Sequence, residues 1–138
     1  MKYLNLSENK TQSEKSLALG FESFFFSGGE PHIKLETSRI DDDVTITCRI
    51  TSMNELGMLM VANDAVRRIQ SPGYGVLLNT SYFPGARQDR VAVLGEPLTV
   101  KVYADIINSM GFDKVFISDP HSDVAAAFSD RDWEVGCV

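Results

Sequence analysis

The fold of this 138-residue chain is decided by the stretch VLLNTSYFPGARQDR at residues 76–90. Its first three residues, Val76 to Leu78, form an apolar run that is typical of a buried strand. Pro84-Gly85 then predicts a turn at the carboxyl end of that strand, where open α/β sheets usually bind ligands. Arg87 and Arg90 follow, and guanidinium groups bind phosphate oxygens in a two-pronged way, which favours a phosphate-bearing ligand. The alternative is a solvated loop whose charges pair with one another.

The composition predicts one soluble globular domain. Hydrophobic residues make up 43% of the chain and charged residues 23%, which is close to the average for globular proteins. The net charge of -6 argues against non-specific binding of nucleic acid, which needs surplus Lys and Arg. It is compatible with a nucleotide ligand, because a few local cations suffice. The apolar runs are too short for a membrane span, so we expect a cytoplasmic protein with no membrane partner.

Strand and helix patterns alternate along the chain. Periodicity predicts strands at residues 2–6, 44–50, 74–79 and 115–117, and helices at residues 52–69, 97–110 and 124–128. A turn signal at Ser27 to Gly29, between two short strands, predicts a hairpin. The alternation indicates an α/β fold: a mostly parallel sheet flanked by helices, with a small antiparallel flap near residues 24–35. No GxGxxG motif and no P-loop is present, so neither a dinucleotide nor a Walker-type kinase site is supported.

Several residues carry structural expectations. Ser52 with Glu55 three residues later forms a capping-box pattern, and the apolar stripe from Leu56 to Ile69 predicts a helix face packed on the sheet. Phe24 and Phe25 are expected in the core. The three methionines of this helix pattern are expected to pack in the core or at an interface: Met53, Met58 and Met60.

Two further groups have a structural and a chemical interpretation. Asp41 to Asp43 predict a solvated turn, with a metal cluster as the alternative. Cys48 and Cys137 form no CxxC pair and no metal-spaced set, so they are interpreted as free thiols in a reducing compartment.

Five segments together resemble the ribose-phosphate pyrophosphokinases, or PRPP synthetases. The run Ala86 to Arg90 matches the ARQDR of the family signature letter for letter. The other four segments, two before this run and two after it, occur in the same order as in the family. They are residues 26–30 (FSGGE, like FxDGE), 52–56 (SMNEL), 96–101 (EPLTVK, like REPISAK) and 118–123 (SDPHSD, like DLHADQ). The resemblance extends over roughly residues 24–128 and implies a fold like the phosphoribosyltransferase sandwich.

The resemblance also implies roles for particular residues. Arg87 and Gln88 would hold ATP, and His121 would coordinate the Mg²⁺ carried with the triphosphate. Phe26 would stack on adenine and Glu30 would contact the base, in the site of a neighbouring subunit. The implied cofactor and substrate are therefore Mg²⁺ and ATP, bound by a homo-oligomer such as a dimer or hexamer. No residue of this chain is implied as catalytic.

The chain departs from the family pattern at particular positions. Gly28 stands where the family has Asp or Asn, Val91 where a lysine is common, and Gly95 where REP has its arginine. Pro120 replaces the leucine before the histidine. The losses at 91 and 95 remove cations, which should weaken triphosphate binding.

Length is the largest departure. The resemblance implies that residues 1–138 form a single domain like the amino-terminal, ATP-side half of the enzyme. No segment like the ribose-phosphate loop of the carboxyl-terminal half follows Phe128. The expected function is thus ATP binding in a Mg-dependent ribose-phosphate diphosphokinase, which converts ATP and ribose 5-phosphate to PRPP and AMP. Alone, the chain would be inactive, and ribose 5-phosphate would bind only if a second domain were supplied. The alternative is a non-catalytic module for self-association or regulation of a full-length partner. A different phosphoribosyl-type enzyme is a third interpretation, disfavoured because no PRPP-binding loop is present.

Overall fold

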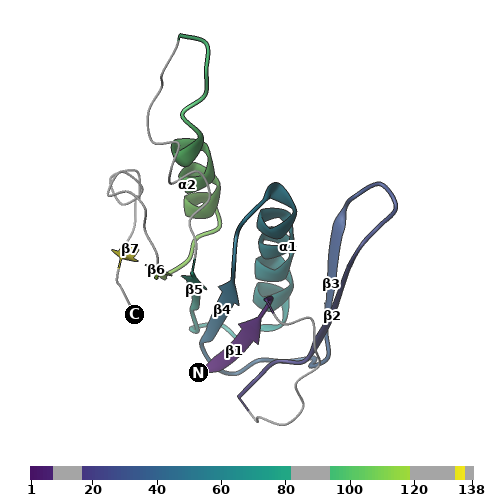
Figure 1. Ribbon diagram of the computed structural model, residues 1–138. Helices are drawn as coiled ribbons and strands as arrows, with labels where there is room; N and C mark the ends of the chain where they lie inside the picture. Colours follow the sequence, from purple (N-terminus) through teal and green to yellow (C-terminus); the bar gives the residue numbers. More distant parts are fainter. Residues whose placement is uncertain (8–16, 82–93, 119–132, 136–138) are drawn as a thin grey trace.

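The computed structural model describes residues 1–7, 17–81, 94–118 and 133–135, as a parallel sheet with helices and a separate hairpin (Figure 1). The sheet consists, in spatial order, of β1 (Lys2–Asn5), β4 (Val44–Cys48), β5 (Val76–Thr80), β6 (Lys114–Ile117) and β7 (Trp133–Val135). The hairpin is formed by β2 (Phe21–Phe25) and β3 (Pro31–Leu35), and the helices are α1 (Met53–Ile69) and α2 (Thr99–Ser109). The predicted α/β fold with an antiparallel flap is confirmed. Strand β7 was not predicted, and the predicted helix at residues 124–128 lies outside the described residues.

The sheet has one fully buried face. In β4 and β5 the residues alternate between buried and half-buried, as a period of two requires. Ile46 and Leu78, which pair across the two strands, are both completely buried, whereas their neighbours Thr45 and Leu77 are half-buried. The buried face is therefore the core side of the sheet.

Both described helices cover this core side. Leu59 of α1 and Ala104 of α2 are completely buried and belong to the same apolar cluster as Ile46 and Leu78. The chain order explains the arrangement. The crossovers from β4 to β5 and from β5 to β6 step in the same direction across the sheet, and right-handed crossovers that step one way place their helices on one face.

The hairpin packs against α1 rather than against the sheet. Ile33 of β3 is buried in the core, and Gly57 of α1 lets the two elements approach, because a Cβ there would lie 3.3 Å from the Pro31 ring. The outer part of the hairpin is exposed: Phe24 and Phe25 are 45% and 46% accessible. The expectation that these two rings lie in the core is therefore wrong for the single chain. Phe25 lines an open cavity beside the start of α1, and Phe24, on the other face of the strand, contacts the rings of Phe26 and His32.

The helix boundaries agree with the expected ones to within two residues. Ser52 is the N-cap of α1, as predicted, but its side chain makes no capping hydrogen bond to the backbone. Pro97 precedes α2, and Gly111, with φ of 73°, follows its end. Of the three methionines expected in the core or an interface, Met58 is buried, while Met53 and Met60 are exposed. Within the described segments, neither helix is long and apolar enough to cross a membrane.

Candidate functional site

The two strands that precede two of the predicted site segments end at the same edge of the sheet. Thr80 of β5 pairs with Cys48 on one side and with Ile117 on the other. The amide of Ser118 donates to the carbonyl of Thr80 at 3.0 Å, so β5 and β6 end level with each other. The segments that follow these two strands carry the predicted ligand residues. Those residues, Arg87, Gln88 and His121, themselves lie outside the described residues.

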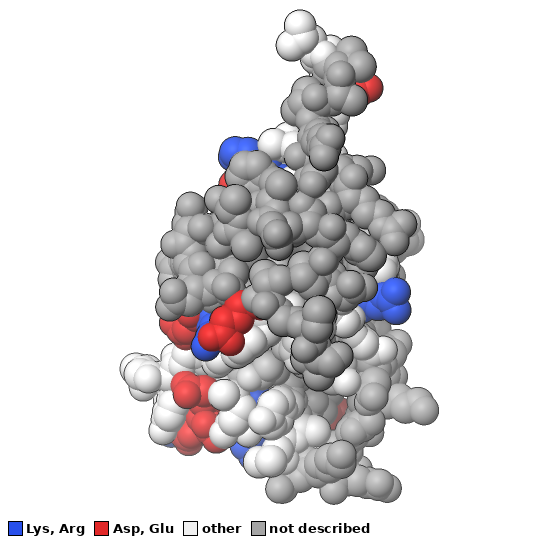
Figure 2. Space-filling model, turned by 60° about the vertical axis from the view of Figure 1, so that its left-hand side comes forward, with Lys and Arg blue, Asp and Glu red and all other residues white. Residues whose placement is uncertain are grey.

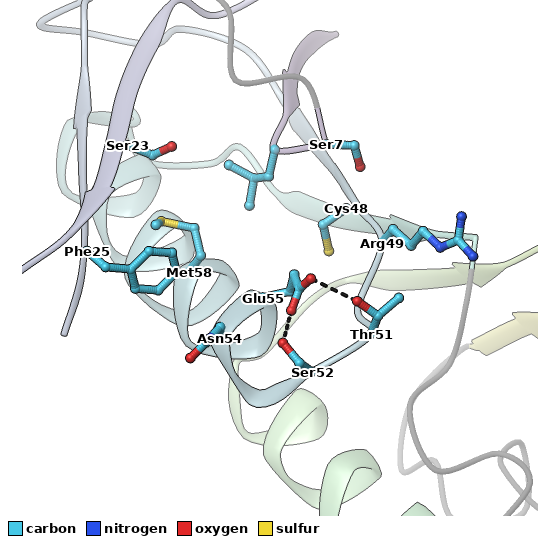
Figure 3. Close-up of a pocket in the computed structure, with 11 residues that line it drawn as sticks. Ser7, Ser23, Phe25, Cys48, Arg49, Thr51, Ser52, Asn54, Glu55 and Met58 are labelled. Atoms are coloured by element: carbon cyan, nitrogen blue, oxygen red, sulfur yellow. Dashed lines mark hydrogen bonds between the residues drawn. The ribbon is translucent and has the colours of Figure 1, made fainter. Parts of the chain in front are cut away.

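A cavity of about 520 Å³ opens at the same edge, between the end of β4, the start of α1 and the hairpin (Figure 3). Its apolar wall comes from Leu6, Phe25, Cys48 and Met58. Its polar rim comes from Ser7, Ser23, Arg49, Thr51, Ser52, Asn54 and Glu55. A wall that is part apolar and part polar, with few charges, suits a small organic ligand.

Glu55 is held in place at the rim of this cavity. Its carboxylate accepts a hydrogen bond from the Thr51 hydroxyl at 2.8 Å and another from the Ser52 hydroxyl. The Ser52 bond is the main reason why the pKa of Glu55 is lowered from its usual value, with Thr51 adding to it. At neutral pH the rim therefore carries a negative charge at the first turn of α1, which suits the positive end of the helix.

Cys48 closes the floor of the cavity as an inert group. Its side chain is buried, and burial, followed by the nearby charge of Glu55, raises the pKa of the thiol to about 12. Since the thiolate is the reactive form, Cys48 is no nucleophile at neutral pH.

Phe26 and Glu30 lie together in the turn of the hairpin. The Phe26 amide donates to the Glu30 carbonyl and the Gly29 amide donates to the Phe26 carbonyl, both at 2.8 Å. Gly29 has a φ of 94°, which favours glycine. Gly28 leaves room for the Glu30 carboxylate, because a Cβ at that position would collide with it. The turn thus carries an aromatic residue and an acidic residue that are joined through the backbone.

The hairpin turn stands away from the ends of β5 and β6 within one chain (Figure 1). The ring of Phe26, which is 49% accessible, contacts Phe24 and His32 at centroid distances of 5.0 and 5.4 Å. The structure of the single chain therefore separates the predicted base-binding pair from the strand ends that precede Arg87 and His121.

The three consecutive aspartates lie at the opposite edge of the sheet, where their carboxylates accept hydrogen bonds from residues of neighbouring loops. Asp41 accepts hydrogen bonds from Arg39, at 2.9 Å, and from Ser71, and Asp43 accepts one from the Gly75 amide at 2.7 Å. The Ser71 hydrogen bond is the main cause that lowers the pKa of Asp41. No group of three or more potential metal ligands occurs in the part of the chain that the structure describes.

Arg49 and its neighbours in the cavity rim were not predicted as site residues. The strand pattern gives no signal for Arg49, because this residue lies inside the strand predicted at residues 44–50. The structure ends β4 at Cys48, which leaves Arg49 as the first residue beyond the strand.

Among the described residues visible in Figure 2, acidic and basic groups are interspersed with uncharged ones, and no large basic patch is seen on this face. This pattern is compatible with the net charge of -6 and with recognition by a few local cations.

No family model matches the chain, but it is similar to individual curated proteins. It is 33% identical over 132 residues to the ribose-phosphate pyrophosphokinase of Mycoplasma genitalium, covering 94% of this chain and 36% of the relative. It is 32% identical over 139 residues to the putative ribose-phosphate pyrophosphokinase 2 of Streptococcus mutans, covering 94% of this chain and 42% of the relative.

The fold agrees with these relatives. The phosphoribosylpyrophosphate synthetase of Mycobacterium smegmatis superimposes with a TM-score of 0.81 at 18% identity, covering 98% of this chain and 47% of that one. The chain thus spans less than half the length of the relatives that it matches. Over that span, this chain belongs to the ribose-phosphate pyrophosphokinase family.

Proposed function

We propose that this chain is the ATP-binding half of a ribose-phosphate diphosphokinase, the amino-terminal part of an enzyme that converts ATP and ribose 5-phosphate to PRPP and AMP. The observation that carries the proposal is the ARQDR run at residues 86–90, which follows β5 in a chain related to ribose-phosphate pyrophosphokinases over 94% of its length. Such a chain would work in the cytoplasm, bind nucleotide, and complete no transfer until a ribose-phosphate site is supplied.

Each proposed site residue has a distinct task. Arg87 and Gln88 would grip the triphosphate by charge-assisted and amide hydrogen bonds. His121, on the segment that follows β6, would orient the magnesium that ATP carries. Phe26 and Glu30 of a second copy would bind adenine, the ring by stacking and the carboxylate by accepting from the exocyclic amine. Transfer of a diphosphoryl group depends mainly on positioning and charge neutralisation, which these groups would supply.

A calorimetric titration of Mg²⁺-ATP at two protein concentrations tests this proposal. We expect saturable binding that strengthens at the higher concentration, because the site needs two copies of the chain. Arg87→Ala should weaken binding by roughly tenfold or more, as expected for the loss of a charged hydrogen-bonding group. An Arg87→Ala chain with unchanged affinity would refute the assignment of the site.

The exposed aromatic turn favours a second candidate function. Phe24 and Phe26 are each about half accessible in the single chain and lie against each other at a centroid distance of 5.0 Å, and adjoining exposed rings mark interaction surfaces. The chain would then be a non-catalytic module that associates with itself or with a full-length partner. A stable oligomer that shows no heat with millimolar nucleotide would favour this function over the first.

A further inference from the structure

Arg49 differs from the other described arginines because it has no hydrogen-bond or ion-pair partner within the part of the chain that the structure describes. Arg39 pairs with Asp41 at 2.9 Å and Arg68 pairs with Asp64 at 2.7 Å. Arg67 donates to Asn63 at 2.9 Å and to the Gly111 carbonyl at 3.0 Å. Among the described arginines, Arg49 alone forms no hydrogen bond or ion pair with another described residue.

The carboxylate of the cavity rim, that of Glu55, is engaged by other groups. Glu55 accepts from Thr51 and Ser52, and Arg49 is not among the causes of its lowered pKa. Figure 3 shows the Arg49 side chain directed away from Glu55. Arg49 is also exposed, so its guanidinium is free to meet a ligand from solvent.

The position of Arg49 points to the kind of ligand. It follows Cys48, whose partner on β5 is Thr80, so Arg49 stands where β4 ends, next to the strand end that leads to Arg87. The partnered arginines lie elsewhere: Arg67 and Arg68 are in the last turn of α1, at its opposite end. Arg49 is therefore the arginine that the described chain places at the carboxyl edge of the sheet.

We propose that Arg49 forms an anion subsite at the ends of β4 and β5 and binds the polyphosphate of the nucleotide. The planar guanidinium can donate two parallel hydrogen bonds to one phosphate group. The subsite contributes to binding of di- and triphosphates and little to binding of a monophosphate, since AMP lacks the outer phosphates. This inference rests on the proposed ATP site, of which it is an extension.

The test compares the wild-type chain with Arg49→Ala, Arg49→Lys and Arg68→Ala by calorimetry. The probes are Mg²⁺-ATP, AMP and inorganic tripolyphosphate. We expect Arg49→Ala to weaken ATP and tripolyphosphate binding by roughly tenfold and to change AMP binding by less than about twofold. Arg49→Lys keeps the charge but loses the two parallel donors of the guanidinium, so its affinity for ATP and tripolyphosphate should lie between those of wild type and Arg49→Ala. Arg68→Ala removes an equal charge at the far end of α1 and should match wild type.

The outcomes separate this inference from the proposed function. If wild type binds ATP and Arg49→Ala binds it equally well, or Arg68→Ala is equally weakened, the subsite is overturned while the ATP site stands. If wild type binds tripolyphosphate through Arg49 but not ATP, the subsite stands and the proposed function is overturned. If wild type binds neither probe, both are overturned. Circular dichroism of each variant checks the fold, and Arg49→Lys supplies the comparison should the alanine variant misfold.

Discussion

Glu55 determines how α1 begins, and its effect is electrostatic. The carboxylate lies in the first turn of the helix, where a negative charge interacts favourably with the helix dipole. The hydroxyls of Thr51 and Ser52 both donate to it. The lowered pKa of Glu55 means that its ionised carboxylate is more stable in the folded chain than in the unfolded chain.

The free energy of unfolding should therefore depend on pH through Glu55. A lowered pKa in the folded state stabilises the fold above the usual glutamate pKa of 4.5, and that contribution is lost as the pH falls through the folded-state value. At pH 7 we expect Glu55→Gln to be less stable by about 1 kcal/mol. The difference should shrink towards pH 3 in urea titrations. Glu96→Gln, at an exposed position before α2, is the control; an equal pH dependence in both variants would contradict the assignment.

The same residues show what a sequence can predict at this scale. The spacing of Ser52 and Glu55 predicted where the helix begins, because that spacing matches one helical turn. It did not predict that the Ser52 hydroxyl binds the Glu55 side chain instead of the backbone. That choice depends on Thr51, which brings a second hydroxyl to the carboxylate from outside the pattern.

At the scale of elements, a polar bridge joins α1 to the end of α2. Asn63, which is buried, donates to the Met110 carbonyl at 3.1 Å. Arg67 donates to the Asn63 amide oxygen and to the carbonyl of Gly111. The carbonyls at a helix end lack partners within the helix, so α1 provides the cap that α2 needs.

Asn63→Ala should consequently destabilise the chain despite alanine's higher helix propensity. It removes one donor to the Met110 carbonyl and frees Arg67 from its orienting contact. A partly buried acceptor without its donor costs about 1–3 kcal/mol, and we expect about 1–2 kcal/mol in urea unfolding after the propensity gain. Asp64→Ala, on the exposed side of the same turn, should change stability by less than about 0.5 kcal/mol. Equal effects of the two substitutions would argue against the bridge.

For the hairpin, the sequence predicted the turn but not which of its side chains are buried. Residues 27–29 predicted its turn, because glycine adopts the positive φ that Gly29 has. The burial of Phe24 and Phe25 was predicted wrongly, because hydrophobicity does not reveal that Phe25 lines an open cavity and that Phe24 lies in an exposed cluster with Phe26 and His32. Only the packing of β3 on α1, through Pro31 and Gly57, determines which part of the hairpin is covered.

At the scale of the whole molecule, the sequence predicted which strands end at the same edge but not how far the hairpin turn lies from that edge. Two apolar strands followed by polar segments were enough to predict that β5 and β6 end together, because parallel strands end on the same side. Arg87 and His121 themselves lie outside the described residues. The distance from that edge to the hairpin turn depends on α1 lying between them (Figure 1). It is this separation that makes a site assembled from two chains the consistent interpretation of Phe26 and Glu30.

The hairpin turn should accordingly mediate self-association. Phe24 and Phe26 are about half exposed and lie against each other at 5.0 Å. Burying the exposed parts of two such rings between chains would contribute on the order of 2–5 kcal/mol. We expect Phe24→Ser combined with Phe26→Ser to shift the chain towards monomer in sedimentation velocity and to leave the circular dichroism spectrum unchanged, since neither ring is in the core. Met60→Ser, which removes a half-exposed apolar side chain from α1, should leave the oligomer intact. If the double variant sediments like wild type, the turn is no interface, and Phe26 and Glu30 cannot reach a neighbouring site through it.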